Sequence, residues 1–173
     1  MITNMNLGKK LMAAFLGVAA VALLIGAVGY YGAVRSQKAI NEVGGVRLPS
    51  IQSIQTINEA QTAVWVSERG LTNRQMLEPE LRKSIYTYVD DAFKRADEAW
   101  KVYELLPQTE EEAQLWKEFV PKWETWKKEF QAVRSISEET DKLLAAGVPQ
   151  TDSRVEELLN KAFEASRSSR LLS

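Results

Sequence analysis

The 173-residue sequence contains no cysteine and no histidine. This excludes disulfide bonds, thiol nucleophiles, Cys/His zinc sites, a Ser-His-Asp triad and a histidine general base. The chain also lacks an excess of either charge, because 22 Lys and Arg oppose 23 Asp and Glu, a formal net charge of −1. Proteins bind nucleic-acid phosphates through many Lys and Arg side chains. We therefore expect no nucleic-acid partner, no cofactor and no enzymatic activity.

Charged residues are missing from residues 11–34, LMAAFLGVAAVALLIGAVGYYGAV. As a helix this segment rises roughly 36 Å, which exceeds the hydrocarbon core of a bilayer, about 30 Å thick. We therefore predict a transmembrane helix over residues 11–34. The alternative is a cleaved signal peptide with its cleavage site at residues 27–29, but the apolar run exceeds the usual apolar core of about 7–15 residues.

The flanking charges predict how this helix is oriented. Lys9 and Lys10 precede the span, and positive residues flank the cytoplasmic end of membrane helices. Residues 1–10 are therefore expected in the cytoplasm and residues 35–173 outside it. A stripe of small residues along the span suits self-association in the bilayer, although frequent Ala and Gly would also produce one by chance.

Helical spacing dominates after residue 35, and it predicts four helices over about 34–76, 79–106, 109–146 and 153–173. Local signals mark their ends: Pro79 suits a first turn, Thr109 with Glu112 forms a capping box, and Ser153 with Glu156 repeats that pattern. Gly147 suits a helix end. Pro121 is expected to bend the third helix.

Two further expectations concern irregularities and the inward faces. Gly44, Gly45 and Pro49 predict a kink or frayed turn in the first helix, because Gly and Pro are poor helix formers. The first helix is expected to face inward through apolar residues that include Ile51 and Ile54. The inward positions expected in the second helix are Leu81, Ile85, Tyr88, Ala92, Ala96, Ala99, Val102 and Leu106.

Short connections force neighbouring helices to run antiparallel, so we predict an all-α, up-down-up-down four-helix bundle behind one transmembrane helix. The fourth helix is much shorter than the first and is expected to cover only the membrane-distal half of its neighbour. This imbalance suggests that the chain is the amino-terminal portion of a longer protein.

Two sequence runs carry a family resemblance. One is Leu48-Pro49-x-Ile51, and the other is ADEAWKVYELLP over residues 96–107. With the membrane anchor, they resemble the four-helix-bundle sensing domain of bacterial methyl-accepting chemotaxis receptors. The resemblance implies a periplasmic, homodimeric sensor in the inner membrane. The same module also serves sensor kinases, and this sequence contains neither a second span nor a methylated signalling hairpin.

The resemblance also implies a ligand site. Arginines near the distal end of the first helix hold ligand carboxylates in such receptors, and Arg69, Arg74 and Thr151 are the matching candidates here. The implied partner is a small chemoeffector, such as a carboxylate or amino acid, or a periplasmic binding protein. As alternatives, the arginines are ordinary surface cations and Thr151 helps to cap the fourth helix.

Two other interpretations remain open from the sequence. Trp116, Trp123 and Trp126 share a face of the third helix, where they form either a ligand cage or, on spacing alone, packed core. The whole chain is either a sensor or a single-span structural bundle without a small ligand. A sensor needs a concave polar pocket near Arg69, whereas a structural bundle packs that end shut.

Overall fold

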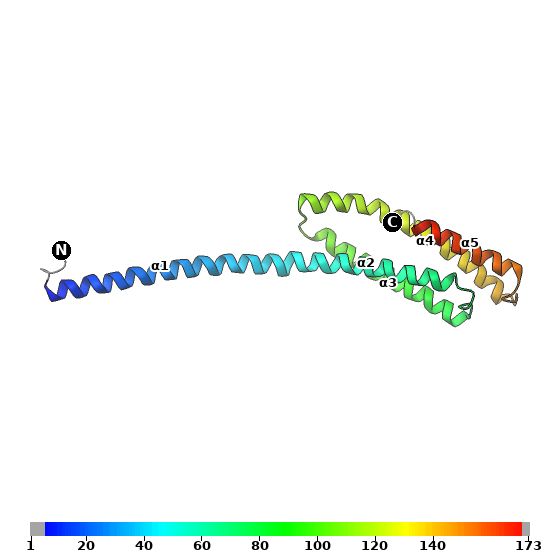
Figure 1. The fold of residues 1–173 in the computed structure, drawn as a ribbon, viewed down its shortest axis with the longest axis horizontal. Helices are drawn as coiled ribbons and strands as arrows, with labels where there is room; N and C mark the ends of the chain where they lie inside the picture. The colour runs from blue at the N-terminus through cyan, green and yellow to red at the C-terminus, as the bar shows by residue number, and fades with distance from the viewer. Residues whose placement is uncertain (1–5, 171–173) are drawn as a thin grey trace. The chain divides into compact units, whose positions relative to one another are not determined.

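The computed structural model describes residues 6–170, which form helices joined by short turns, with no strand among them (Figure 1). The elements are α1 (Leu7–Glu42), the π-helix η1 (Val43–Arg47), α2 (Leu48–Leu71), α3 (Pro79–Leu105), α4 (Glu110–Ala145) and α5 (Ser153–Arg170). They belong to two compact units that divide between Leu48 and Pro49. The first unit holds α1 and η1, and the second holds the bundle.

Helix α1 qualifies as a membrane-spanning helix by length and composition. Its most apolar stretch has a mean hydropathy of 2.6, and no part of that stretch is buried. No residue of α1 is buried at all, which distinguishes it from a core helix of a globular domain. The expected span over residues 11–34 lies wholly inside this helix.

The expected kink or frayed turn at Gly44 and Gly45 takes a different form. The backbone stays helical there and widens into the π-helix η1, whose ring closes from the Leu48 N–H to the Val43 carbonyl. Pro49 follows directly and has no N–H to donate, so the usual α-helical bonding cannot continue unchanged. A Cβ atom added at either glycine would meet no neighbouring atom within 4 Å, so packing against the glycines does not force the wider turn.

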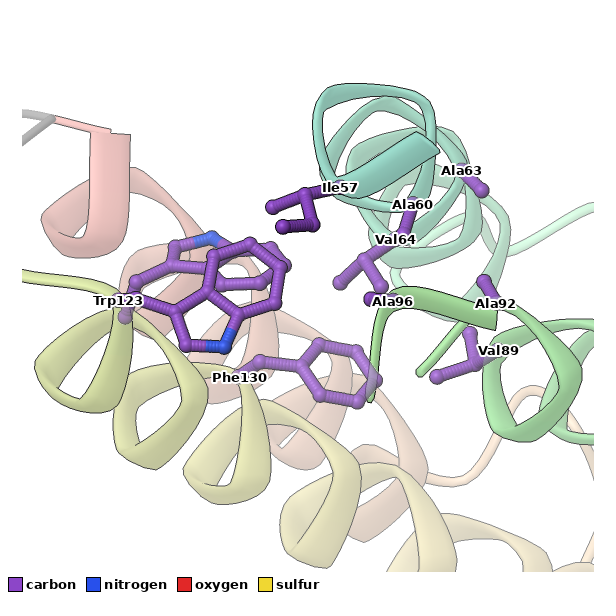
Figure 2. Close-up of a cluster of buried hydrophobic side chains, with 10 residues drawn as sticks. Ile57, Ala60, Ala63, Val64, Val89, Ala92, Ala96, Trp123 and Phe130 are labelled. Carbon is purple, nitrogen blue, oxygen red and sulfur yellow. The ribbon is translucent and has the colours of Figure 1, made fainter. Parts of the chain in front are cut away.

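Helices α2, α3, α4 and α5 form the antiparallel four-helix bundle that the sequence predicts. Its main core places large rings from α4 against small side chains of α2 and α3. Figure 2 shows Trp123 and Phe130 reaching from α4 toward Ala60, Val64 and Ala96. Large and small residues thus interdigitate and fill the space between helices. A second cluster of buried side chains, Leu77, Val155 and Leu159, lies at the end of the bundle that carries the α2–α3 and α4–α5 turns.

The inward face of α3 differs from the sequence expectation. Arg82, Val89 and Tyr103 are buried, whereas their neighbours Leu81, Tyr88 and Val102, which the sequence places inward, are exposed. The inward face is therefore shifted by one residue at these three positions, while Ala92 and Ala96 are buried as expected. The shift has a physical cause: the core accepts the charged Arg82 because acceptors on α2 and α4 satisfy its guanidinium.

The ends of α3 and α4 follow the predicted signals. Pro79 occupies the first turn of α3, and Thr109 and Glu112 form the expected capping box of α4. Gly147 adopts a φ of 82°, the left-handed conformation that favours glycine after a helix. Helix α4 continues through Pro121 without ending.

The start of α5 corrects one assignment. The side chain that caps the helix is Asp152 rather than Ser153, because Asp152 Oδ1 accepts a 2.9 Å hydrogen bond from the Arg154 N–H. An aspartate that immediately precedes the first helical residue is among the strongest N-caps. The expected beginning of the helix at residue 153 is correct.

Helix α5 is half as long as α4, with 18 residues against 36. Within the described residues it lies beside the part of α4 that precedes the α4–α5 turn (Figure 1). Ile51 and Ile54 of α2, which the sequence places inward, are exposed, whereas Ser50 and Ser53 in the same stretch are buried. Ile57, Val64 and later positions of α2 are buried.

Candidate functional site

The three residues that the resemblance assigns to ligand binding lie toward one end of the bundle. Arg69 is in the last turn of α2, Arg74 in the α2–α3 turn and Thr151 in the α4–α5 turn. Figure 1 shows both turns at the same end. All three residues are exposed, and within residues 6–170 none of them forms a hydrogen bond or ion pair with another. The fold therefore places Arg69, Arg74 and Thr151 toward the same end of the bundle but forms no direct contact of this kind between them.

The two arginines differ in their surroundings. Arg74 forms an ion pair with Glu156 of α5, with 2.7 Å between Nη2 and Oε1. The guanidinium of Arg69 has no such partner anywhere in the described part of the chain. Of the two cations, Arg69 is consequently the one whose donors are available to an anion from solution.

A groove of about 470 Å³ lies beside Arg69, between α2 and α3. We call it the α2–α3 groove. Apolar side chains form most of its surface, and Arg69 is the one charged residue among those that line it. Its walls include Val66, Arg69, Met76, Leu81, Ile85 and Tyr88. This end of the bundle is therefore concave, as a sensor requires, but more apolar than the sequence interpretation assumes.

Gly70 explains how the floor of this groove is built. A Cβ atom at Gly70 would lie 2.9 Å from Cδ1 of Ile85 on α3, closer than such atoms approach in proteins. The missing side chain lets Ile85 pack against the backbone of α2. The two helices approach closely at this point, and both Gly70 and Ile85 line the α2–α3 groove.

A layer of polar residues is buried near the same end of the bundle. We call this set the buried polar layer. Each member is at most 1% exposed: Glu68, Arg82, Ser137, Thr140 and Ser166. Buried polar groups are costly unless they find hydrogen-bond partners. The contacts of this layer therefore decide which helix registers are stable.

Two sets of bonds link the helices through this layer. Ser166 Oγ of α5 donates a 2.9 Å hydrogen bond to Oε2 of Glu68 on α2. Arg82 of α3 donates to the backbone carbonyls of Leu71 and Ser137, each at 3.0 Å, and pairs with the carboxylate of Asp141. Together these contacts connect all four helices of the bundle.

Tyr86 completes the arrangement around Arg82. Its hydroxyl donates a 2.6 Å hydrogen bond to Asp141 Oδ2, and the Arg82 guanidinium reaches the same hydroxyl at 3.4 Å. Burial, and then the bond to Asp141, raise the pKa of the Tyr86 phenol well above its usual value of 10.0. The phenol stays protonated and acts as a donor, so this cluster is a structural network rather than a proton-transfer site.

The tryptophan face of α4 is packed core. Trp123 and Trp126 are buried, their ring centroids are 4.7 Å apart, and Phe93 of α3 packs against both. Trp116 is half-buried, with its ring 4.3 Å from that of Trp100. Neighbouring rings thus fill the space around Trp123 and Trp126, and the packing interpretation is correct for these two residues. Trp116 packs against Trp100 but also lines an open groove.

Metal chemistry has no candidate ligand set in the described residues. Residues 6–170 contain no group of three or more Asp or Glu side chains placed to hold an ion. A second groove of about 410 Å³ runs between α2 and the start of α4, lined largely by apolar and aromatic residues such as Ile54, Leu115 and Phe119. Neither the acidic side chains of residues 6–170 nor the lining of this second groove forms a set of reactive groups.

Comparison with known proteins identifies a relationship along nearly the whole chain. The model of one protein family, described as a four helix bundle sensory module for signal transduction, matches residues 4–167. Comparisons with curated proteins and with solved structures found no match. The matched range includes the apolar helix α1 as well as α2, α3, α4 and most of α5.

Proposed function

Because the chain belongs to the family of four-helix-bundle sensory modules for signal transduction, we propose that it is the extracytoplasmic ligand-sensing module of a methyl-accepting chemotaxis receptor. One observation carries the proposal: the family match spans both the apolar helix and the bundle, the two parts that a transmembrane sensor must combine. Members of this family receive a signal, and no step of catalysis is part of the proposed role.

The proposed topology follows from charge and length. Residues 1–10 lie in the cytoplasm, residues 11–34 cross the inner membrane, and residues 35–173 form the periplasmic sensing domain. The uncharged segment is long enough to cross a bilayer, and Lys9 and Lys10 stand at its start. This arrangement exposes the bundle to solutes that reach the periplasm.

The proposed input is a small carboxylate or amino acid that binds at the end of the bundle carrying Arg69, Arg74 and Thr151. A ligand changes an equilibrium between helix arrangements only if it binds one arrangement more tightly. The buried polar layer supports such a role because it joins the four helices near this end. A ligand that reaches Arg74 must also compete with Glu156 for the guanidinium.

The active form in this proposal is a homodimer, as the family resemblance implies. Large apolar side chains exposed on α2 support an association surface, and Ile51 and Val66 are each at least 60% exposed. Dimers that share a ligand site bind their ligand more tightly than monomers do. Ligand should therefore favour the dimer, which cross-linking in vesicles can measure.

A thermal-shift screen of the full chain in lipid nanodiscs tests the function. All five tryptophans lie in the bundle, so tryptophan fluorescence reports its unfolding without a signal from α1. A compound that binds only the folded state raises the melting temperature, because it stabilises that state by about 2.7 kcal/mol at a hundredfold excess over Kd.

The screen should cover amino acids, organic acids and neutral compounds of matched size. We expect at least one carboxylate to raise the melting temperature of the wild-type chain, with a smaller rise in Arg69→Gln, Arg74→Gln or Thr151→Ala. If no compound in the panel changes the melting temperature, direct ligand sensing is wrong for this chain. A rise that all three variants retain would keep the sensing function and reject this site.

A further inference from the structure

The α2–α3 groove combines three properties that point to one class of ligand. Its volume of about 470 Å³ falls in the range of small-molecule sites, about 300–1,000 Å³. Its surface is mostly apolar, with Val66, Leu81 and Ile85 among its walls. Its one charged residue, Arg69, has no ion-pair partner among the described residues. An apolar body with an anionic group matches all three.

The charge around the groove limits that anion to a single carboxylate. Beyond Ser84 and Tyr88 the surface continues into a shallower depression that also contains Glu80, Lys83 and Asp91. Two acids against one base leave this neighbouring surface net negative. A second carboxylate on the ligand would therefore be repelled there, whereas an uncharged apolar or aromatic body meets no opposing charge.

We propose that the α2–α3 groove of a single protomer binds small monocarboxylates with an apolar or aromatic body, with the carboxylate on the Arg69 guanidinium. This inference rests on the proposed sensing function and assigns its input to one groove. A guanidinium offers paired N–H donors that match a carboxylate, and it stays charged at any physiological pH. Arg74 is excluded from this site because it does not line the groove and pairs with Glu156.

The groove also offers a route from ligand to structure. Its floor is the contact between Gly70 of α2 and Ile85 of α3, and Leu71, which follows Gly70, gives its carbonyl to Arg82. A ligand seated between the two helices contacts both sides of this approach. Binding in the groove therefore favours one spacing of α2 and α3 near the buried polar layer.

The test uses 4-phenylbutyrate as the probe and the neutral 4-phenylbutyramide as its matched control. Saturation-transfer NMR on the full chain in nanodiscs gives the Kd, and empty nanodiscs correct for partition into lipid. We expect saturable binding of the acid at millimolar concentration and weaker binding of the amide. Arg69→Gln should weaken the acid about tenfold to a hundredfold, as the loss of a charge-assisted hydrogen bond does.

Two further variants separate the groove from its surroundings. Lys83→Gln removes an exposed neighbouring cation of α3 that does not line the groove, and it should change the Kd less than twofold. Ser84→Phe fills the groove from an exposed position of α3 and should abolish binding while the melting temperature stays close to that of the wild type.

The inference is overturned if the probe shows no saturable binding, or if its Kd is unchanged in both Arg69→Gln and Ser84→Phe. Equal effects of Arg69→Gln and Lys83→Gln would also overturn it, because they would indicate general electrostatic attraction. These results leave the sensing function standing if another compound in the thermal-shift panel stabilises the bundle. Failure of every compound in the thermal-shift panel would reject both the sensing function and this inference about the groove.

Discussion

The hydroxyl of Ser166 donates a 2.9 Å hydrogen bond to the buried carboxylate of Glu68 and so ties α5 to α2. Consecutive residues of a helix point about 100° apart, so a rotation of α5 by one residue removes Ser166 from this position. The bond is therefore specific to one register of the two helices. In a sensor that works by small helix displacements, such a hydrogen bond opposes movement of α5 relative to α2 unless a ligand stabilises the displaced arrangement.

Ser166→Ala should lower the free energy of unfolding by about 1–3 kcal/mol, because the buried Glu68 carboxylate loses a donor. Ser137→Ala is the matched control: Ser137 is equally buried, and its hydroxyl has no hydrogen-bond partner among the described residues. That substitution should be neutral or slightly stabilising. Urea unfolding followed by tryptophan fluorescence measures both, and equal losses in the two variants would contradict the assigned role of the Glu68 bond.

Arg82→Met should destabilise the bundle by about 3 kcal/mol, because it removes two bonds to carbonyl groups and leaves Asp141 without its cation. The control is Arg134→Met, which breaks a more exposed pair with Asp90 and should cost no more than about 1 kcal/mol. The same urea experiment compares them. If the Arg134 variant is the less stable one, the buried network is not the main electrostatic contribution to stability.

Tyr86→Phe should change how stability responds to alkaline pH. The pKa of Tyr86 is raised in the folded protein, so the wild-type chain keeps the full stabilisation from its neutral phenol below pH 10 and loses it as pH rises further. At pH 8 the variant should be less stable by about 1 kcal/mol. Above pH 10 the difference should shrink, because the unfolded wild-type chain gains a phenolate that the variant lacks.

Free energies of unfolding measured from pH 8 to strongly alkaline solution give this comparison directly, and absorbance at 295 nm follows tyrosinate formation in parallel. The phenolate attributable to Tyr86 should form together with unfolding of the bundle. A constant difference in stability between the two proteins across this range would show that ionisation of Tyr86 is not coupled to folding.

Signals close together in the chain are sufficient to predict the helices. Thr109 and Glu112 are three residues apart and satisfy each other's backbone groups, so their effect does not depend on tertiary structure. The same holds for Pro79 at the start of α3 and Gly147 after α4. Because these four residues separate the helical segments, the order and antiparallel course of the helices follow from the sequence.

The burial of charge could not be predicted in this way. Arg82 is inside because acceptors on two other helices meet it, and one of them, the Ser137 carbonyl, is 55 positions away in the chain. Hydrophobic spacing alone favours Leu81 for the same position. The α2–α3 groove escaped prediction for a related reason: it depends on how closely Gly70 approaches Ile85, which is a property of packed helices.

The proposed orientation of α1 can be tested with single cysteines, because the sequence contains no cysteine of its own. Gly8→Cys precedes the apolar span and Lys38→Cys follows it; both positions are exposed. With the chain in bacterial inner membranes, a membrane-impermeant maleimide should label Lys38→Cys in spheroplasts and Gly8→Cys only in inverted vesicles. Positive residues before the span retain that end in the cytoplasm.

Leu23→Cys serves as the control for the span, because a residue in mid-bilayer should react only after detergent is added. Labelling of Gly8→Cys and Lys38→Cys from the same side would show that the helix does not cross the membrane. Loss of the residues before Tyr30 in the intact mass of the purified protein would instead establish cleavage of a signal peptide. Either result would remove the membrane helix from the proposed signalling route, whereas opposite-side labelling of an intact chain would place the bundle in the periplasm.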